Sequence, residues 1–349
     1  MEIIKVNLVK SIDDSYEIMI GQDWGSKIIA YLKEKSYGQK YAIITDSIVQ
    51  QQLGMKFKNA LRSAGIKCDL FAFRAGETNK TLAQIRKLAT KMLHKSYNRS
   101  DCVIALGGGI VGDIAGFLAA IFMRGIPVIQ IPTSLLAMVD SSIGGKTGVD
   151  LDIGKNLIGV FYQPKKVYID INFLNTLPQK QISNALAEII KYGCIYDKDF
   201  FTYLEKNIDQ IFQKDPKVLS FIIQKSCEIK GKIIEMDEKE SNIRMILNYG
   251  HTIGHAVENL SRYKILHGYA VAIGMVKINE IAVSGGLMGK NDADRIKNLL
   301  NLAKLPTAIP GKFTWPQIEK VMMKDKKVKN GKINFIICPE IGKAKTIEI

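Results

Sequence analysis

Histidine is scarce in this chain and clustered where it occurs. Three of the four histidines, His251, His255 and His267, lie in the stretch NYGHTIGHAVENLSRYKILHGYAVAIGM, and only His94 lies elsewhere. Imidazole is the most frequent protein ligand of zinc-like metals and a common proton carrier near neutral pH. The cluster therefore indicates a metal or acid–base site rather than an accident of composition.

The spacing of the first two histidines is similar to a zinc-peptidase motif. If residues 252–259 are helical, His251 and His255 lie four apart on one helix face. Thr252, however, stands where the H-E-x-x-H motif carries its general base. The sequence therefore argues against a metallopeptidase.

A candidate carboxylate ligand comes from the segment AEIIKYG, residues 187–193. Glu188 and Lys191 lie three apart on one face of a predicted helix, among apolar residues. A buried carboxylate and ammonium need pairing or a metal, although an ordinary surface pair is an equal alternative. Two histidines and Glu188 would leave a coordination position open for substrate, as in catalytic zinc sites. The spacing does not tell which two histidines bind.

A glycine segment indicates a nucleotide site. Gly107, Gly109 and Gly112 have the G-x-G-x-x-G spacing, after a predicted strand and at the start of a predicted helix. Such glycines let backbone N–H groups approach a pyrophosphate. The segment follows the third predicted strand rather than the first, and no acidic residue lies about 20 residues downstream. Asp46, after an earlier strand, could hold the ribose instead; a tight structural turn is the alternative.

A second glycine segment, GGKT at 144–147, is similar to the end of a Walker A loop. Asp140 stands where that motif needs its first glycine, so a P-loop is rejected. Lys146, Lys155 and Asn156 remain as groups on a glycine-rich loop that could bind an anionic substrate, or as surface residues in a turn.

The apolar periodicity divides the chain in two. Short apolar runs predict strands, with helical patterns between them: strands at 41–45, 69–73, 102–106, 128–131 and 167–171, and helices at 82–93 and 110–123. This alternation predicts a parallel sheet covered on both faces. After Pro178, helical spacing predicts helices at 181–192, 200–212, 216–236, 252–260, 270–283 and 293–302, then a hairpin of 332–337 with 344–347. We therefore expect an α/β domain over 1–177 and an all-α domain over 178–349.

Composition narrows the class of protein. The apolar stretches are interrupted before the roughly 20 residues that a membrane span needs, and the start lacks a signal peptide's apolar core. The five scattered cysteines include no CxxC pair, which favours a reducing cytoplasm. The net charge of +15 fits a lysine-rich surface or a cleft that attracts an anionic substrate. Because no RNA-binding or zinc-finger motif is present, we expect no nucleic-acid partner.

The longer motifs resemble those of 3-dehydroquinate synthases, within the sugar-phosphate cyclase group. The resemblance spans residues 75–328 and rests on GGGIVGD (107–113), RGIPVIQIPTSLLAMVDSSIGGKTGVD (124–150), GKNLIGVFYQP (154–164), AEIIKYG (187–193), LNYGHTIGHAVE (247–258) and HGYAVAIGM (267–275). It implies a Rossmann-like NAD domain, a helical metal domain and a cytoplasmic homodimer without membrane partner. It also implies conversion of 3-deoxy-D-arabino-heptulosonate 7-phosphate to 3-dehydroquinate and phosphate, with zinc or cobalt and with NAD recycled in each turnover.

The resemblance also implies roles for individual residues. The metal ligands would be Glu188, His251 and His267. NAD would contact Asp46, Glu77, Lys80, Gly108, Gly109, Ile110, Val111, Gly112, Asp113, Thr133, Ser134, Lys146, Lys155, Phe173, Leu174, Asn175 and Thr176. The substrate phosphate would be held by Lys146, Asn156, Asn248, His255 and Lys326, with Arg124 reaching across the dimer. The carboxylate and hydroxyls of the substrate would be contacted by Arg244, Lys230, Asp140 and Lys191. Lys155 also belongs to the predicted catalytic residues.

Three positions depart from the family pattern: Tyr269 replaces a Glu, Asn242 a Gly and Ser134 a Thr. Tyr269 matters most, since it lies two residues from a predicted metal ligand; we expect activity to survive. The rival hypotheses are another sugar-phosphate cyclase, such as 2-deoxy-scyllo-inosose synthase, a metal-dependent polyol dehydrogenase that releases NADH, and a basic RNA-binding protein.

Overall fold

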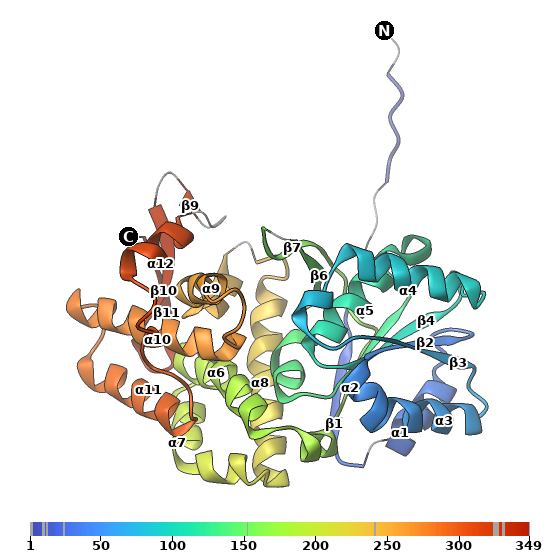
Figure 1. Cartoon of the computed structure of the whole chain (residues 1–349), viewed down its shortest axis with the longest axis horizontal. Helices are drawn as coiled ribbons and strands as arrows, with labels where there is room; N and C mark the ends of the chain where they lie inside the picture. The colour runs from blue at the N-terminus through green and yellow to red at the C-terminus, as the bar shows by residue number, and fades with distance from the viewer. Residues whose placement is uncertain are drawn as a thin grey trace.

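The chain folds into two parts that lie side by side, an α/β part and a helical part (Figure 1). The computed structural model describes residues 3–8, 11, 13–23, 25–151, 153–240, 242–323, 328–329 and 332–348. No helix within these ranges is both long and apolar enough to cross a membrane.

A wholly parallel sheet forms the first part, as predicted, with six strands where five were predicted. Its strands, in spatial order, are β1 (Glu17–Gly21), β8 (Lys166–Asp170), β5 (Val128–Pro132), β4 (Cys102–Gly107), β2 (Tyr41–Asp46) and β3 (Cys68–Phe73). The chain runs from β2 outward to β3 and then returns to β4 on the other side of β2. Parallel sheets bind ligands where the order reverses in this way, at the carboxyl ends of the strands.

Both faces of the sheet are covered, which explains why its strands are apolar throughout. Ala42 and Ile44 of β2 pack in one buried cluster with α4 (Leu82–His94) and α5 (Gly109–Ile121). Tyr41 and Ile43 point to the other face and pack with α1 (Gly25–Glu34) and α3 (Met55–Ser63). Short helical segments complete this part: α2 (Ser47–Val49), η1 (Gln50–Gly54), η2 (Glu77–Asn79), η3 (Phe122–Arg124), η4 (Ala137–Ser141) and η5 (Ile171–Thr176).

Two sequence predictions for this part are wrong. The loop predicted to carry Lys146, Lys155 and Asn156 is an antiparallel hairpin of β6 (Lys146–Leu151) and β7 (Gly154–Phe161). Glycines interrupt the alternation of apolar and polar residues in this hairpin. They stand where the strands pair closely, since a Cβ at Gly148 would come 3.1 Å from the Cα of Gly159. The glycine segment follows the fourth strand along the chain, not the third, because β1 was not predicted.

The second part is helical, as predicted, with one small sheet. Its helices are α6 (Gln179–Ile195), α7 (Lys198–Phe212), α8 (Pro216–Met236), η6 (Ile243–Asn248), α9 (His251–Leu260), α10 (His267–Ser284), α11 (Lys290–Leu302) and α12 (Trp315–Met322). The predicted tail hairpin is present as β10 (Lys332–Glu340) and β11 (Lys343–Glu348), with β9 (Val328–Lys329) beside β10. We keep 177/178, between β8 and α6, as the proposed domain boundary.

Helices α9 and α10 pack closely because glycines line their contact. A Cβ at Gly274 of α10 would overlap the carbonyl oxygen of Gly250, and a Cβ at Gly254 would lie 3.0 Å from the carbonyl oxygen of Ala270. Since His251 begins α9 and His267 begins α10, this contact brings the two histidines together.

We predict that Gly274→Ala lowers the free energy of unfolding by about 1–3 kcal/mol, because overpacking must push α9 away from α10. Gly231→Ala is the control: Gly231 lies in α8 with open space around its Cα. That control should raise stability by about 0.4–1 kcal/mol, the usual gain where alanine fits the backbone. Urea unfolding of the metal-free proteins measures both; equal stability of Gly274→Ala and wild type would contradict the packing argument.

Candidate metal and nucleotide site

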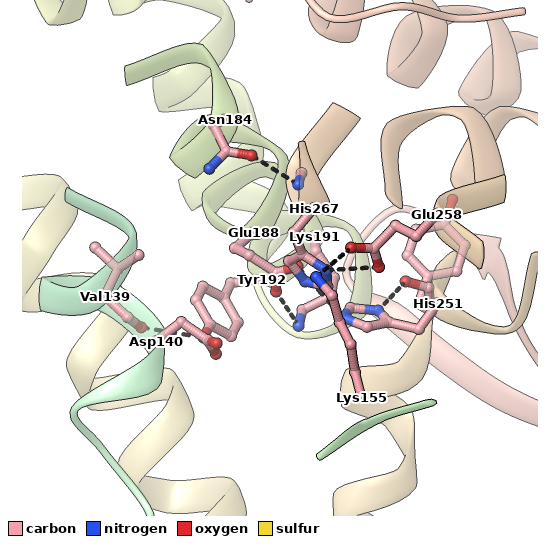
Figure 2. A network of polar contacts seen from close by, with 12 residues as sticks. Val139, Asp140, Lys155, Asn184, Glu188, Lys191, Tyr192, His251, Glu258 and His267 are labelled. Carbon is pink, nitrogen blue, oxygen red and sulfur yellow. Dashed lines mark hydrogen bonds and ion pairs between the residues drawn. The ribbon is translucent and has the colours of Figure 1, made fainter. Parts of the chain in front are cut away.

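Glu188, His251 and His267 converge from three helices, α6, α9 and α10 (Figure 2). The Nε2 atoms of His251 and His267 each lie 3.4 Å from the Glu188 Oε1 atom. One ligand atom from each of the three residues lies within 4.8 Å of the others, a spacing that a single metal ion can span. The sequence spacing left open which histidines join Glu188, and the structure brings these two to it.

Each of these histidines turns its Nε2 atom inward because its Nδ1 atom has a partner elsewhere. The His251 Nδ1 atom lies 3.1 Å from the carbonyl oxygen of Tyr249, and the His267 Nδ1 atom lies 3.2 Å from Glu258 Oε2. Carbonyl and carboxylate oxygens only accept hydrogen bonds, so both Nδ1 atoms carry the proton. Both Nε2 atoms can then offer a lone pair to a metal.

The Glu188 carboxylate is fully buried, and neither oxygen accepts a hydrogen bond within the described residues. Burial opposes its charge, but the Lys191 ammonium paired with it holds its pKa well below the usual range. Burial also keeps the pKa of His251 well below the ordinary histidine value, so this ring is neutral. An ionised carboxylate without hydrogen bonds, facing two imidazoles, is a donor set that fits Zn²⁺ or Co²⁺.

Without a metal, a proton supplies the positive charge at this point. Burial opposes protonation of His267, but the Glu188 and Glu258 carboxylates on either side raise its pKa to about 10. The same arrangement holds the pKa of Glu258 at about 2, despite its burial. A divalent cation between Glu188 and the histidines would replace that proton.

A buried ion pair lies beside the metal cluster. Lys230 of α8 donates to the Oδ1 atom (2.6 Å) and the backbone carbonyl (2.5 Å) of Asp140, and Tyr192 donates to the same Oδ1 atom at 2.9 Å. Burial opposes the charge of Asp140, but Lys230 lowers its pKa to about 2. The structure thus brings three predicted residues, Asp140, Lys191 and Lys230, to one wall near Glu188.

Glu240, which was not predicted, joins two of the predicted phosphate-binding residues. Its carboxylate pairs with Lys146 and accepts a hydrogen bond from the Asn248 amide at 2.6 Å. Glu240 lies between α8 and η6 with a positive φ of 57°, so the backbone turns this side chain toward the two donors. The carboxylate thus contacts two residues that were predicted to hold the substrate phosphate.

Arg244 is almost fully buried beside this group. Its guanidinium donates to the carbonyl oxygens of Gly144 (3.2 Å) and Glu238, and it stacks over the ring of Phe161. Its Nε atom is buried and has no hydrogen-bond partner within the described residues. This spare donor fits a planar carboxylate.

The glycine segment lies at the reversal point of the sheet, where β4 ends and α5 begins. Gly108 precedes the first turn of α5, and a Cβ at Gly109 would come 2.8 Å from Ser141 Oγ. Asp46 ends the neighbouring strand β2, where its carboxylate accepts from the backbone N–H groups of Ile48 and Val49. Both features therefore lie at the edge where a dinucleotide is expected.

Several further predicted nucleotide contacts lie at the same edge. Thr133 and Ser134 follow β5, with the Thr133 N–H bonded to Gly107, and η5, which holds the residues from Phe173 to Thr176, follows β8. Lys80 pairs with Asp113 at 2.6 Å and donates to Asn156. Burial would lower the pKa of Lys80, but Asp113, Glu77 and Asp150 raise it above its usual value, so the ammonium stays charged.

The remaining predicted residues are Arg124, Lys326 and His255. Arg124 lies in the exposed turn that follows α5. Lys326 lies outside the described residues. His255 is exposed on α9, and its ring centroid lies 5.3 Å from that of His251 and 6.0 Å from that of His267.

The sequence reasoning missed two carboxylates, Glu240 and Glu258. Glu258 ends the HTIGHAVE segment, three residues after His255 on a predicted helix, so a spacing rule for helix faces could have found it. Glu240 lies in a charged stretch between two helices, where no periodicity applies. Only the fold places it against Lys146, which is 94 residues away.

Known proteins are similar to this chain over nearly its whole length. Residues 70–184 match the family model of the 3-dehydroquinate synthase N-terminal domain, and residues 185–328 match that of the C-terminal domain. A 3-dehydroquinate synthase of Desulforamulus reducens is 44% identical over 329 residues, which cover 94% of this chain and 92% of the relative.

Two solved structures share the fold. The 2-epi-5-epi-valiolone synthase of Streptomyces hygroscopicus, with NAD⁺ and Zn²⁺ bound, has a TM-score of 0.89 at 24% identity, covering 98% of this chain and 94% of its own. A 2-deoxy-scyllo-inosose synthase complexed with carbaglucose-6-phosphate, NAD⁺ and Co²⁺ has a TM-score of 0.84 at 27% identity, covering 96% and 93%.

We predict that Glu240→Ala tightens the binding of inorganic phosphate, because the variant frees Lys146 and Asn248 from a competing carboxylate. The gain should be about 3- to 10-fold, the effect of losing one partly exposed charge pair. Isothermal titration of phosphate into the metal-free protein measures it. Glu205→Gln, which breaks a distant ion pair with Arg295 at 2.7 Å, is the control and should change nothing. Weaker phosphate binding by Glu240→Ala would refute the competition.

Proposed function

This chain belongs to the 3-dehydroquinate synthase family, and we propose that Glu188, His251 and His267 hold the divalent metal of that family's reaction. The reaction converts 3-deoxy-D-arabino-heptulosonate 7-phosphate to 3-dehydroquinate and phosphate. The chain is thus a phosphate-eliminating lyase that uses NAD and a divalent metal. One observation carries the metal assignment: a buried Glu188 carboxylate without hydrogen bonds faces the Nε2 atoms of two histidines.

The chemistry divides between bound groups and the chain. When bound, the metal would acidify neighbouring substrate hydroxyls, and NAD would take up a hydride and return it. Lys146 and Asn248 would hold the substrate phosphate once Glu240 yields its place to it, with His255 exposed nearby. Arg244 would bind the substrate carboxylate through its spare Nε donor.

The ring hydroxyls would be oriented by the wall of Asp140, Lys191 and Lys230. Because Lys230 and Tyr192 both donate to Asp140, this carboxylate stays ionised and its position is fixed. It can accept a hydrogen bond from a substrate hydroxyl, while Lys191 and Lys230 can donate to one. The wall therefore sets which face of the sugar meets the metal.

The rival hypotheses are less well supported. A relative that is 44% identical over nearly the whole chain is a 3-dehydroquinate synthase, whereas the other cyclases share the fold at 24% and 27% identity. A carboxylate-bearing substrate also fits the buried Arg244. An RNA-binding protein has no use for the metal cluster.

We further propose that the protein acts in the cytoplasm as a homodimer. All five cysteines are free thiols and buried, as suits a reducing compartment. Arg124 lies in an exposed turn after α5, and as the family resemblance implies it would serve the site of a second copy. Exposed apolar side chains, Ile121 and Met123, flank that turn and offer a surface for the partner.

The first experiment measures phosphate release from 3-deoxy-D-arabino-heptulosonate 7-phosphate, with zinc and with NAD far below substrate. We expect many turnovers per NAD and loss of activity on chelation. His251→Ala should lose both zinc and activity. His255→Ala should keep zinc but slow phosphate release by about 10- to 100-fold, the effect of one charge-assisted hydrogen bond. NADH accumulating from simple polyols without phosphate release would instead indicate a dehydrogenase.

The dimer proposal predicts complementation between two inactive variants. In a mixed dimer of Arg124→Ala and His251→Ala chains, one of the two sites has both its own metal ligands and the partner's Arg124. The purified mixed dimer should therefore have about one half of wild-type activity. Co-expression with two affinity tags and an activity assay of the mixed fraction test this. Full activity of Arg124→Ala alone, or no recovery in the mixed dimer, would contradict it.

A further inference from the structure

Glu258 connects the proposed metal centre to a distant segment of the chain. Only 2% of its side chain is exposed, and each carboxylate oxygen has one partner. Oε2 lies 3.2 Å from the His267 Nδ1 atom, and Oε1 lies 3.2 Å from the Lys155 ammonium. Figure 2 shows Lys155 extending from the hairpin strand toward Glu258 and the histidines.

The two proposed metal-ligand histidines are held in different ways. The buried His251 is anchored by a backbone carbonyl, that of Tyr249 at the start of its own helix. The side chain of His267 is 30% exposed, and its Nδ1 atom bonds a side chain, that of Glu258. The orientation of the His267 ring therefore depends on where Glu258 is held, whereas that of His251 does not.

Lys155 holds Glu258 from the other half of the molecule. It lies on β7, near the turn of the hairpin that also carries Lys146 and Asn156. Its ammonium also lies 3.6 Å from Glu77 and 4.7 Å from the ring centroid of Tyr263. Because Glu258 is buried and Lys155 is mostly so, their attraction is screened less by water than that of a surface pair.

We propose that Glu258 is a positioning residue: it fixes the metal-binding tautomer and orientation of His267, and through Lys155 it sets the distance between the β6–β7 hairpin and the metal. The inference rests on the proposed metal site. It adds that the hairpin and the metal are coupled through one carboxylate, so that displacement of the hairpin weakens the metal site and loss of the metal loosens the hairpin.

The test replaces Glu258 by glutamine, which keeps the shape but removes the charge. We expect Zn²⁺ affinity, measured by competition with a chromophoric chelator, to fall by about 10- to 100-fold, the usual effect of losing a carboxylate behind a metal-binding histidine. The visible absorption of the Co²⁺-substituted protein should change in position or intensity, because the ring at one ligand is reoriented. Glu258→Asp, which keeps the charge at a shorter reach, should recover part of the affinity.

Glu280→Gln is the matched control, since Glu280 lies on the same helix as His267 but pairs with the surface residue Lys277. It should leave Zn²⁺ affinity and the Co²⁺ spectrum unchanged. A purely structural role of Glu258 would lower the unfolding midpoint of the metal-free protein and leave the metal affinity of the folded fraction intact; that outcome overturns the proposal.

Lys155→Met tests the coupling and does not depend on whether Glu258→Gln folds. We expect it to weaken Zn²⁺ binding by about 3- to 10-fold, as for loss of one partly buried ion pair. Its effect should nearly vanish in a Glu258→Gln background, since the two residues act through one contact. Additive effects of the two substitutions would overturn the coupling.

His251→Ala separates this inference from the proposed function. If His251→Ala keeps stoichiometric zinc, the metal assignment itself fails. If His251→Ala loses zinc while Glu258→Gln binds it like wild type, with an unchanged Co²⁺ spectrum, the metal assignment stands and the positioning role of Glu258 is refuted.

Discussion

Burial of the Glu188 carboxylate without hydrogen bonds is the constraint on which the surrounding structure depends. A lone buried anion costs several kcal/mol, so its charge must be met by cations or a metal. The chain supplies Lys191 one helical turn away and two imidazoles from other helices. Even with these partners, neither carboxylate oxygen accepts a hydrogen bond within the described residues. The arrangement therefore fits the proposed metal, which would lie between Glu188 and the histidine Nε2 atoms.

The helix contact between α9 and α10 follows from this requirement. Two histidines that begin different helices can face one carboxylate only if those helices approach at their first turns. Gly250 has a left-handed backbone (φ 77°) and Gly274 lets the carbonyl oxygen of Gly250 approach α10. Gly268 similarly approaches the Asn184 carbonyl of α6, and its N–H bonds the Asn184 side chain at 2.8 Å. Glycine at these positions lets the helices approach closely, as the proposed metal geometry requires.

Sequence patterns predicted the parallel sheet and most helices, because buried strands read as apolar runs and the long helices have strong periodicity. Helical spacing predicted both ends of α8, Pro216 and Met236, as the structure has them. The strand β1 was missed because EIMIG is a short edge strand, and the β6–β7 hairpin was missed because its glycines interrupt the alternation. Glu188 and His251 could be named as candidates because each has a polar partner at helical spacing, Lys191 and His255. Glu240 could not be found, because its role depends on a contact across 94 residues.

The departures from the family pattern also have a physical reading. Asn242 has φ −153°, so its backbone is not in the left-handed region that favours glycine. Ser134 keeps the hydroxyl that a threonine would have. Its Oγ atom lies 3.3 Å from where a Cβ at Gly108 would stand, and it accepts a hydrogen bond from the Ala137 N–H. The third departure, Tyr269, is half-buried against the core. The proposed ligand His267 is anchored through its Nδ1 atom by Glu258 of α9, a contact that does not involve position 269. A carboxylate on a neighbouring helix can therefore support the metal ligand, and the exchange of Glu for Tyr two residues away leaves that support in place.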